Sequence, residues 1–180
     1  MVALEYTYKR LYDPADYAAI YRRLRDEDLL WALYSEVEPG EWSEEAYVQM
    51  HGAGTSRETW GGYVDGELAG VACIWPFAGS RRTRCAEISL TAFRGHFNQA
   101  ARLARGCLMQ MLDTHRDRLA SFIGRVPAPN RHILNMLSSL GFQRKFKIPE
   151  LFWYTKNQKY VDGWIVFASP QDVKATWEVE

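Results

Sequence analysis

Hydrophobic and polar positions recur with the spacing of strands and helices along most of the chain. Residues 4–12 alternate loosely, as a strand does, and a helix with an apolar face follows from Pro14. Asp13 is its expected N-cap, because a short polar side chain there can accept an unpaired backbone N–H. A second helix is predicted over 29–33 before a break at Pro39-Gly40, and a third opens at Ser43.

The middle of the chain predicts a hairpin and a strand–helix–strand unit. Two strands, 58–64 and 68–75, are joined by Asp65-Gly66, a strong hairpin signal. Residues 86–92 alternate as a half-buried strand, and a helix with Asn98 as its expected cap then runs to about Asp113. A strand over 118–126 completes the unit.

Residues 126–142 predict a strand end, a turn, a short helix and a new strand. Pro127 and Pro129 hold the residues before them extended, and Asn130 is a good N-cap for an apolar helix. Gly141 stands where a left-handed residue ends a helix. Strands over 143–147, 151–154 and 164–167 follow, with a turn over 156–162 and a possible short helix from Pro170.

Length and composition favour one domain that is large enough to bury a core. The 180 residues contain no apolar run that could cross a membrane, and the N-terminus lacks the pattern of a signal peptide. Cys73, Cys85 and Cys107 are an odd set without short spacing, which indicates reduced thiols in a cytoplasmic protein. The histidines have no metal-ligand spacing, and no nucleophile elbow or phosphate-binding P-loop is present.

The net charge is zero, but the charges are unevenly distributed. Residues 81–147 hold 13 Lys and Arg against three acids, whereas residues 1–80 hold six against 14. The middle of the chain could therefore attract an anionic ligand, or the opposite charges could face each other within the fold. The run Arg81-Arg82-Thr83-Arg84 is too short to indicate nucleic-acid binding.

Several of these motifs together resemble the GCN5-related N-acetyltransferases (GNAT) over about residues 58–167. They are Asn130 before an apolar helix, Leu140-Gly141-Phe142 after it, the Asp65-Gly66 hairpin and the turn from Lys156 to Asp162. The resemblance implies an α/β (α+β) GNAT-type fold, with a mixed, mostly antiparallel sheet flanked by helices. Residues 1–180 would form one domain, with 1–52 on the acceptor side and 58–167 as the core. An ordinary strand–helix–strand unit is the alternative for 126–142.

The resemblance also implies a site for acetyl-CoA. In the family, an Arg/Gln-x-x-Gly-x-Gly/Ala loop lets backbone N–H groups at a helix start bind the pyrophosphate. The implied cofactor-binding residues are Leu90, Thr91, Ala92, Arg94, Gly95, His96, Asn98, Gln99, Ala100, Arg102 and Asn130. Phe97 and Gln99 stand where the family has glycines, as in divergent phage-encoded members, so we expect weaker binding of coenzyme A.

The implied chemistry needs a base, a polarised carbonyl and an acid for the leaving thiolate. Glu87 is the sole carboxylate over 81–112 and is the candidate catalytic base. Leu137 occupies the position of the family's tyrosine acid, so the thiolate would leave unassisted or with help from another tyrosine. The candidate tyrosines are Tyr63, Tyr154 and Tyr160.

The function so predicted is acyl-CoA-dependent N-acetylation of an unknown amine, on a small molecule or a protein. A catalytically silent binding or assembly module of the same fold is the main alternative, and a nucleic-acid accessory protein is a weaker one. We expect no membrane association, a cytoplasmic location and a possible homodimer. Aromatic side chains could line the acceptor pocket or belong to the core; they are Trp31, Tyr34, Trp42 and Tyr47.

Overall fold

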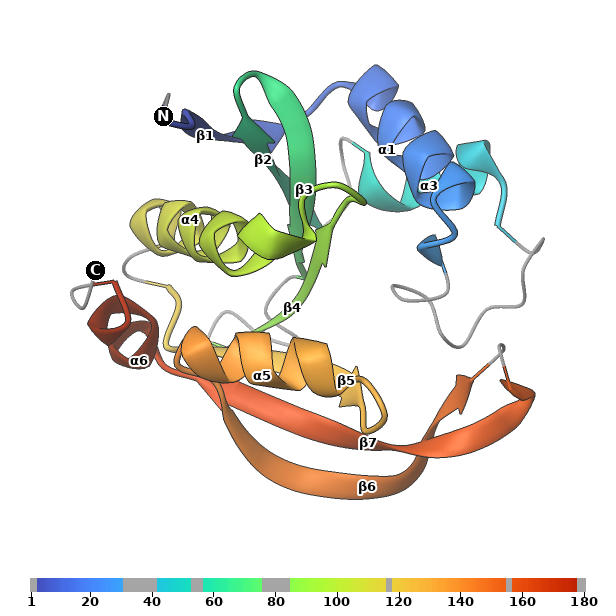
Figure 1. The fold of residues 1–180 in the computed structure, drawn as a ribbon, viewed down its shortest axis with the longest axis vertical. Coiled ribbons are helices and arrows are strands. Elements are labelled where there is room, and N and C mark those ends of the chain that lie inside the picture. The colour runs from blue at the N-terminus through green and yellow to red at the C-terminus, as the bar shows by residue number, and fades with distance from the viewer. Residues whose placement is uncertain are drawn as a thin grey trace.

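A seven-stranded sheet with strand order β1-β2-β3-β4-β5-β7-β6 forms the centre of the protein (Figure 1). The computed structural model describes residues 3–30, 42–52, 57–75, 85–115, 118–154 and 157–177. The strands are β1 (Tyr6–Leu11), β2 (Glu58–Val64), β3 (Glu67–Ile74), β4 (Cys85–Ala92), β5 (Ser121–Pro127), β6 (Gln143–Tyr154) and β7 (Lys159–Ala168). All neighbours pair antiparallel except β4 and β5, which pair parallel, so the predicted mixed sheet is confirmed.

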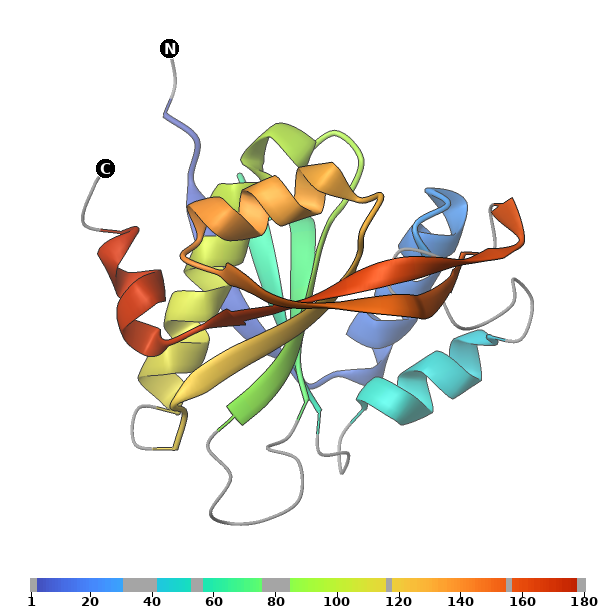
Figure 2. The same ribbon diagram turned by 90° about the horizontal axis from the view of Figure 1, so that it is seen from below.

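Helices cover both faces of the sheet, and each face has its own apolar cluster. The helices are α1 (Pro14–Asp26), α3 (Glu44–His51), α4 (Ala100–Thr114), α5 (Arg131–Ser139) and α6 (Pro170–Ala175). Val71 of β3 packs in the cluster with α1 and α3, whereas its neighbour Ala72 packs in the cluster with α4, α5 and α6. Side chains alternate across a strand, so this pair identifies the two faces. Figure 2 shows α5 beside the start of α4. Among the described residues, no helix is long and apolar enough to span a bilayer.

The helix starts predicted from local sequence are confirmed. The Asp13 side chain accepts the Ala15 N–H at 2.8 Å, with Pro14 in the first turn of α1. Ser43 accepts the Ala46 N–H at 3.1 Å to cap α3. Ser169 and Asp172 form a capping box at α6. Of the predicted helix over 29–33, residues 31–33 lie outside the described residues, as does the break at Pro39-Gly40.

Helix α5 is closed at both ends by the residues that predicted it. Asn130 accepts the Ile133 N–H at 3.4 Å. Gly141 has φ +87°, its N–H donates to Ser138 O at 3.2 Å, and the Phe142 N–H donates to Leu137 O at 2.9 Å. This pair of bonds is a Schellman motif, which satisfies the last carbonyls of the helix. The two caps fix the length of α5 between β5 and β6.

Asn98 does not cap the long helix, so that prediction is wrong. A 3-10 turn, η1 (Phe97–Gln99), precedes α4, which begins at Ala100 with Gln99 at its N-cap position. Gln99 makes no side-chain capping bond, because its amide oxygen is hydrogen-bonded to His96 Nδ1 at 2.9 Å. The tight turn places the N-cap position at Gln99, one residue beyond the predicted cap.

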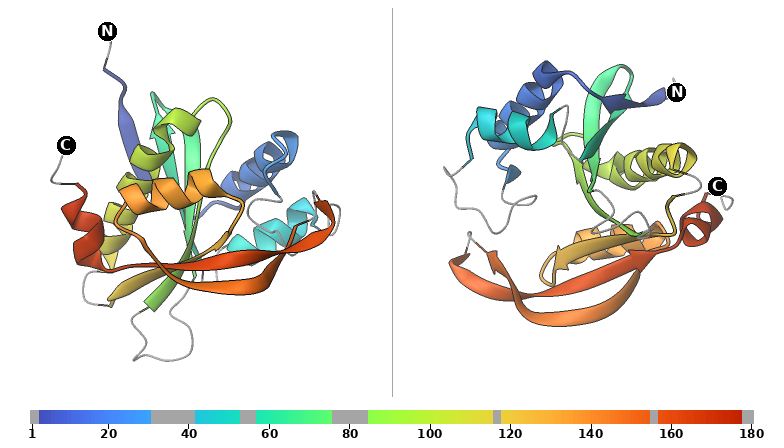
Figure 3. Two further views of the ribbon diagram at one scale, coloured as in Figure 1. Left: turned by 60° about the horizontal axis from the view of Figure 1, so that its bottom comes forward. Right: turned by 180° about the vertical axis from the view of Figure 1, so that it is seen from behind.

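The last two strands are longer than the sequence predicts. β6 is continuous over the two predicted segments, and an irregular register around Glu150, with φ +50°, bridges them. β7 begins at Lys159, so Asp162 lies in a strand and the predicted turn over 156–162 is too long. Figure 3 shows the resulting long, curved hairpin at the sheet edge. The first eight residues of β6 are all exposed, so this part of the strand has no alternation of buried and exposed side chains.

Strands β4 and β5 pair over three residues and then separate. The pairs are Cys85 with Ser121, Ala86 with Phe122 and Glu87 with Ile123. Beyond them, β4 is paired with β3 up to Ala92, while β5 is paired with β7 up to Pro127. These two strands, which flank the long helix of the predicted strand–helix–strand unit, pair parallel, and their divergence positions the candidate site.

Candidate active site

A cleft of about 950 Å³ opens where β4 and β5 separate. One wall is β4 from Glu87 to Ala92, and the other is the end of β5 from Gly124 to Pro127. The start of α4 and the inner face of α5 complete the lining. This volume is typical of sites for small molecules and cofactors.

Seven of the predicted site residues come together in this cleft. They are Glu87, Leu90, Thr91, Ala92, Asn98, Ala100 and Asn130. The edge of β4 that faces β5 has no strand partner beyond Glu87 in the described residues. Backbone N–H and C=O groups need partners when water is excluded, so this edge can bind an extended polar chain.

The loop before α4 is shaped by one glycine and one internal hydrogen bond. Gly95 has φ +90°, and an added Cβ would meet no atom within 4 Å, so its role is conformational. The bond between His96 Nδ1 and Gln99 Oε1 closes the turn. Phe97 is 56% exposed and lines the cleft. The Phe97 ring therefore faces the cleft and not the core. It occupies space next to the loop in which the resemblance implies phosphate binding.

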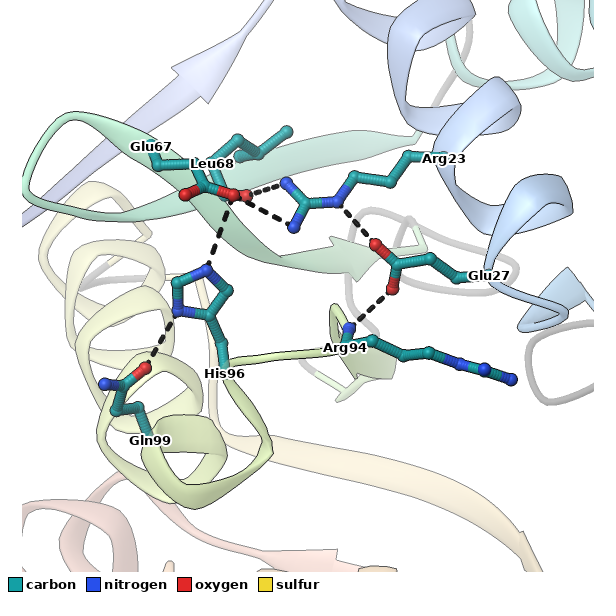
Figure 4. Close-up of polar contacts among 7 residues, drawn as sticks. All are labelled: Arg23, Glu27, Glu67, Leu68, Arg94, His96 and Gln99. Atoms are coloured by element: carbon teal, nitrogen blue, oxygen red, sulfur yellow. Dashed lines mark hydrogen bonds and ion pairs between the residues drawn. The ribbon is translucent and has the colours of Figure 1, made fainter.

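Charged residues of α1 and the β2–β3 hairpin hold this loop from outside (Figure 4). Glu27 accepts the Arg94 backbone N–H with one carboxylate oxygen and receives Arg23 Nε at 2.7 Å on the other. Arg23 also donates to Glu67 Oε1 at 3.1 Å, and His96 Nε2 lies 3.5 Å from that same oxygen. The loop is thus tied to the end of α1 through side chains that sequence motifs did not indicate.

Five predicted cofactor residues lie outside the cleft lining: Arg94, Gly95, His96, Gln99 and Arg102. The Arg94 guanidinium points away from the start of α4 in Figure 4. The Arg102 guanidinium lies 4.0 Å from the centre of the Tyr6 ring on β1. In this arrangement neither arginine faces the cleft, so a phosphate there would rely on backbone N–H groups of η1 and the first turn of α4.

Four further lining residues are Arg57, just before β2, Trp75, just after β3, Glu87 of β4 and Arg125 of β5. Glu87 Oε1 accepts Arg125 Nε at 2.6 Å, and the Trp75 N–H donates to Glu87 O at 2.7 Å. The Arg57 guanidinium lies 4.8 Å from the centre of a Trp75 ring. All four residues line the cleft. Sequence reasoning found Glu87 but missed both arginines, since they belong to no motif and meet only through strand pairing.

The predicted aromatic pocket is met in part. Trp42 lines the cleft, together with Leu29, Met50 and Phe152. Tyr47 is instead fully buried and stacks on His51 with ring centres 4.4 Å apart, so it belongs to the core. Trp31 and Tyr34 lie outside the described residues.

Among the described residues, no tyrosine lines the cleft. Tyr63, Tyr154 and Tyr160 are therefore not placed to protonate a leaving group there. Leu137, where the resemblance implies an acid, is buried and contributes an apolar side chain to the lining. His132, in the first turn of α5, also lines the cleft, although sequence reasoning did not select it.

Burial shifts the pKa values of His51 and Cys107 toward their uncharged forms. His51 Nδ1 lies 3.8 Å from Cys73 Sγ, and burial, followed by the charge of Arg57, lowers the pKa of His51 to about 4. Burial raises the pKa of Cys107 to about 12. All three cysteines are unbridged thiols, Cys85 half-buried and the others buried. The described residues contain no cluster of side chains suited to a metal ion.

Comparison with known proteins identifies the fold. No protein-family model matches the sequence, and no curated protein does. Among solved structures, a GCN5-related N-acetyltransferase from Kribbella flavida is 20% identical, covers 91% of this chain and 97% of its own, and superposes with a TM-score of 0.70. Spermidine N-acetyltransferase from Vibrio cholerae, in complex with CoA and spermine, is 16% identical with a TM-score of 0.72, covering 94% and 98%.

The ribosomal-protein-S18-alanine N-acetyltransferase from Escherichia coli is 18% identical, covers 92% of this chain and 94% of its own, and has a TM-score of 0.66. Each of these alignments covers more than 90% of both chains. The chain therefore has the GNAT acyltransferase fold, and the predicted fold class is confirmed.

Proposed function

We propose that the protein is an acyl-CoA-dependent N-acetyltransferase that binds acetyl-CoA between β4 and β5. The observation that carries the proposal is the unpaired edge of β4 along a cleft of about 950 Å³, in a fold shared with N-acetyltransferases. The amides of the pantetheine arm would pair with the backbone of residues 90–92. The pyrophosphate would lie at the start of η1 and α4, where the helix dipole gives a positive potential.

The acceptor amine would approach from the side of Glu87. Its nitrogen attacks the thioester carbonyl carbon, the bond from carbon to sulfur breaks, and the amine proton passes to the Glu87 carboxylate. A backbone N–H of residues 90–92 would stabilise the developing oxyanion. The thiolate can leave without a protein acid, because a thiol with a pKa near 8.5 is a good leaving group. Leu137 is compatible with this route.

Acetyl-CoA should raise the melting temperature of the protein. A ligand at about 100 times its Kd stabilises the folded state by about 2.7 kcal/mol, or roughly 5–10 °C for a domain of this size. Ala101→Phe, which fills the cleft from α4, should reduce this shift. Gln110→Phe places the same side chain on an exposed position of α4 outside the cleft and should leave it unchanged.

The alternative is a catalytically silent protein that kept the fold as a binding or assembly module. The exposed Phe97 ring in the loop and the apolar Leu137 favour it. If neither acetyl-CoA nor CoA shifts the melting temperature at millimolar ligand and low salt, this alternative replaces the enzyme. The phage-like character of the loop, a cytoplasmic location and a homodimer stay predictions.

A further inference from the structure

We infer that His96 is a positioning residue for the coenzyme, and that its protonation holds the loop of residues 93–99, which we call the coenzyme loop, in its binding arrangement. The inference rests on the proposed function, because it assigns a regulation by pH to the same site. It is carried by the two contacts of the His96 ring, one with Gln99 inside the loop and one with Glu67 at the start of β3 (Figure 4).

The His96 ring supports the part of the coenzyme loop that lines the cleft. Phe97 and Asn98 are the loop residues in the cleft lining, and they stand between His96 and Gln99 in the chain. The bond of 2.9 Å between His96 Nδ1 and Gln99 Oε1 therefore spans both lining residues. The His96 side chain is 15% exposed and is not part of the lining. It would thus act on a bound coenzyme through the shape of the loop.

Both ring nitrogens of His96 face oxygen atoms. Nδ1 faces the amide oxygen of Gln99, and Nε2 lies 3.5 Å from Glu67 Oε1. An imidazolium has two N–H donors and can serve both oxygens, whereas a neutral imidazole has one donor and serves only one of them. If the Gln99 amide turns its NH₂ group toward a neutral ring, the hydrogen bonds persist, but the ionic attraction to Glu67 is still lost. The charged ring therefore connects the coenzyme loop to β3 more strongly than the neutral ring does.

The charged groups around His96 are Glu67 of β3 and two residues at the end of α1. Arg23 Nη2 donates to the same Glu67 oxygen at 3.1 Å, and Glu27 accepts the Arg94 backbone N–H. The Arg94 guanidinium points away from His96 (Figure 4). Arg23 offsets part of the Glu67 charge, and the Glu67 side chain is 62% exposed, so water screens its attraction for an imidazolium. The effect of protonation is therefore that of a partly exposed ion pair.

The direction of the pH effect follows from the two contacts. Histidine side chains ordinarily change charge between about pH 5 and 8. At the acidic end of this range the His96 ring is charged, both contacts form, and the loop is ordered before the coenzyme arrives. As the pH rises the ring loses a proton, and part of the binding free energy must order the loop. We therefore expect affinity for the coenzyme to fall about threefold between about pH 5.5 and about pH 7.5.

The experiment is titration calorimetry of the whole protein with 3′-dephospho-CoA at a series of pH values. This probe lacks the phosphate monoester of CoA, which itself titrates near pH 6, and its pyrophosphate keeps a constant charge. A change in Kd with pH then reports on the protein. Binding should also take up a fraction of a proton at intermediate pH, because linkage requires it, and buffers of different ionisation enthalpy measure that fraction.

Two variants and two controls assign the pH dependence to His96. His96→Gln and Glu67→Gln should each flatten the profile, and the exposed position of Glu67 makes its variant the safer one for folding. Glu44→Gln removes an exposed carboxylate of α3, which lies 3.8 Å from Arg22, and should keep the profile. His115→Gln should keep it too, because His115 also contacts a glutamate but lies after the last turn of α4 and outside the cleft lining.

The outcomes separate this inference from the proposed function. A flat profile in the native protein, or an unchanged profile in His96→Gln, would overturn the role of His96. An unchanged profile in Glu67→Gln would show that the imidazolium attracts the pyrophosphate by its charge alone, and would overturn the inference as well. If the native protein binds neither 3′-dephospho-CoA nor CoA at any pH, the proposed function is refuted. Binding without a pH profile refutes only the role of His96.

Discussion

Removal of the Glu27 carboxylate should loosen the loop that precedes α4. Glu27 is the C-cap of α1, its side chain is 17% exposed, and it joins Arg23 to the Arg94 backbone N–H. A hydrogen bond to a charged group contributes about 1.5–3 kcal/mol. Arg23 keeps its contacts with Leu68 and Glu67 after the change, and water reaches the exposed side of the loop. We therefore expect Glu27→Ala to cost about 2 kcal/mol.

The assay is thermal unfolding followed by CoA titration. A cost of about 2 kcal/mol corresponds to a fall of about 4–8 °C in melting temperature for a chain of this length. If ordering the loosened loop takes about half of that free energy, about 1 kcal/mol, from CoA binding, CoA affinity falls about fivefold. Asp26→Ala is the matched control, because Asp26 is adjacent on the same helix, 64% exposed and paired only locally with Arg25 in the described contacts.

Two results would refute this reasoning. If Glu27→Ala melts no lower than Asp26→Ala, the contact with Arg94 contributes nothing measurable. If it melts lower but binds CoA with native affinity, Glu27 stabilises the fold without shaping the ligand loop.

Four further predictions follow from single residues. Phe97→Gly should leave CoA affinity unchanged or raise it in a titration, and should cost less stability than a core Phe would, because the ring is 56% exposed. Glu87→Gln should lower kcat in a thiol-release assay while CoA affinity stays nearly native; unchanged turnover across pH would exclude it as the base. Burial lowers the pKa of His51 from 6.5 to about 4, so the unfolded state takes up a proton at a higher pH than the folded state does. Urea unfolding should therefore show about 3 kcal/mol of stability lost as pH falls from about 6.5 to about 4. His51→Leu should flatten this slope. Gly141→Ala should destabilise more than Gly66→Ala in the same assay, since both have positive φ but only at Gly141 would the Cβ meet backbone, Asp172 O at 2.5 Å.

Features set by neighbours in the sequence were predictable. The caps at Asp13, Ser43 and Asn130, and the left-handed Gly141, each depend on residues within one helical turn. The β4 wall of the cleft was predictable for the same reason, because alternation over 86–92 is local. The 3-10 turn before α4 was missed, since the bond from Gln99 to His96 competes with capping by Asn98.

Features set by packing across the sheet were not predictable. Arg102 is drawn onto Tyr6 of β1, which lies almost a hundred positions earlier in the chain. Arg57 precedes β2 and Arg125 lies in β5, and no spacing in the sequence marks either arginine as a neighbour of the cleft. Exposed β6 has few buried side chains, so its continuation past Glu150 depends on pairing with β7.

The short pairing of β4 with β5 divides the sheet into two parts, and we call this weak boundary between β4 and β5 the seam. The strands on one side of the seam all come from residues 6–92, and those on the other side from residues 121–168. Three residue pairs join the two parts within the sheet. A molecule that pairs with the edge of β4 and also contacts β5 would add bonds between the two parts. We therefore expect ligand to slow amide hydrogen exchange in β4 and β5 more than in β2, and to make the two parts unfold as one.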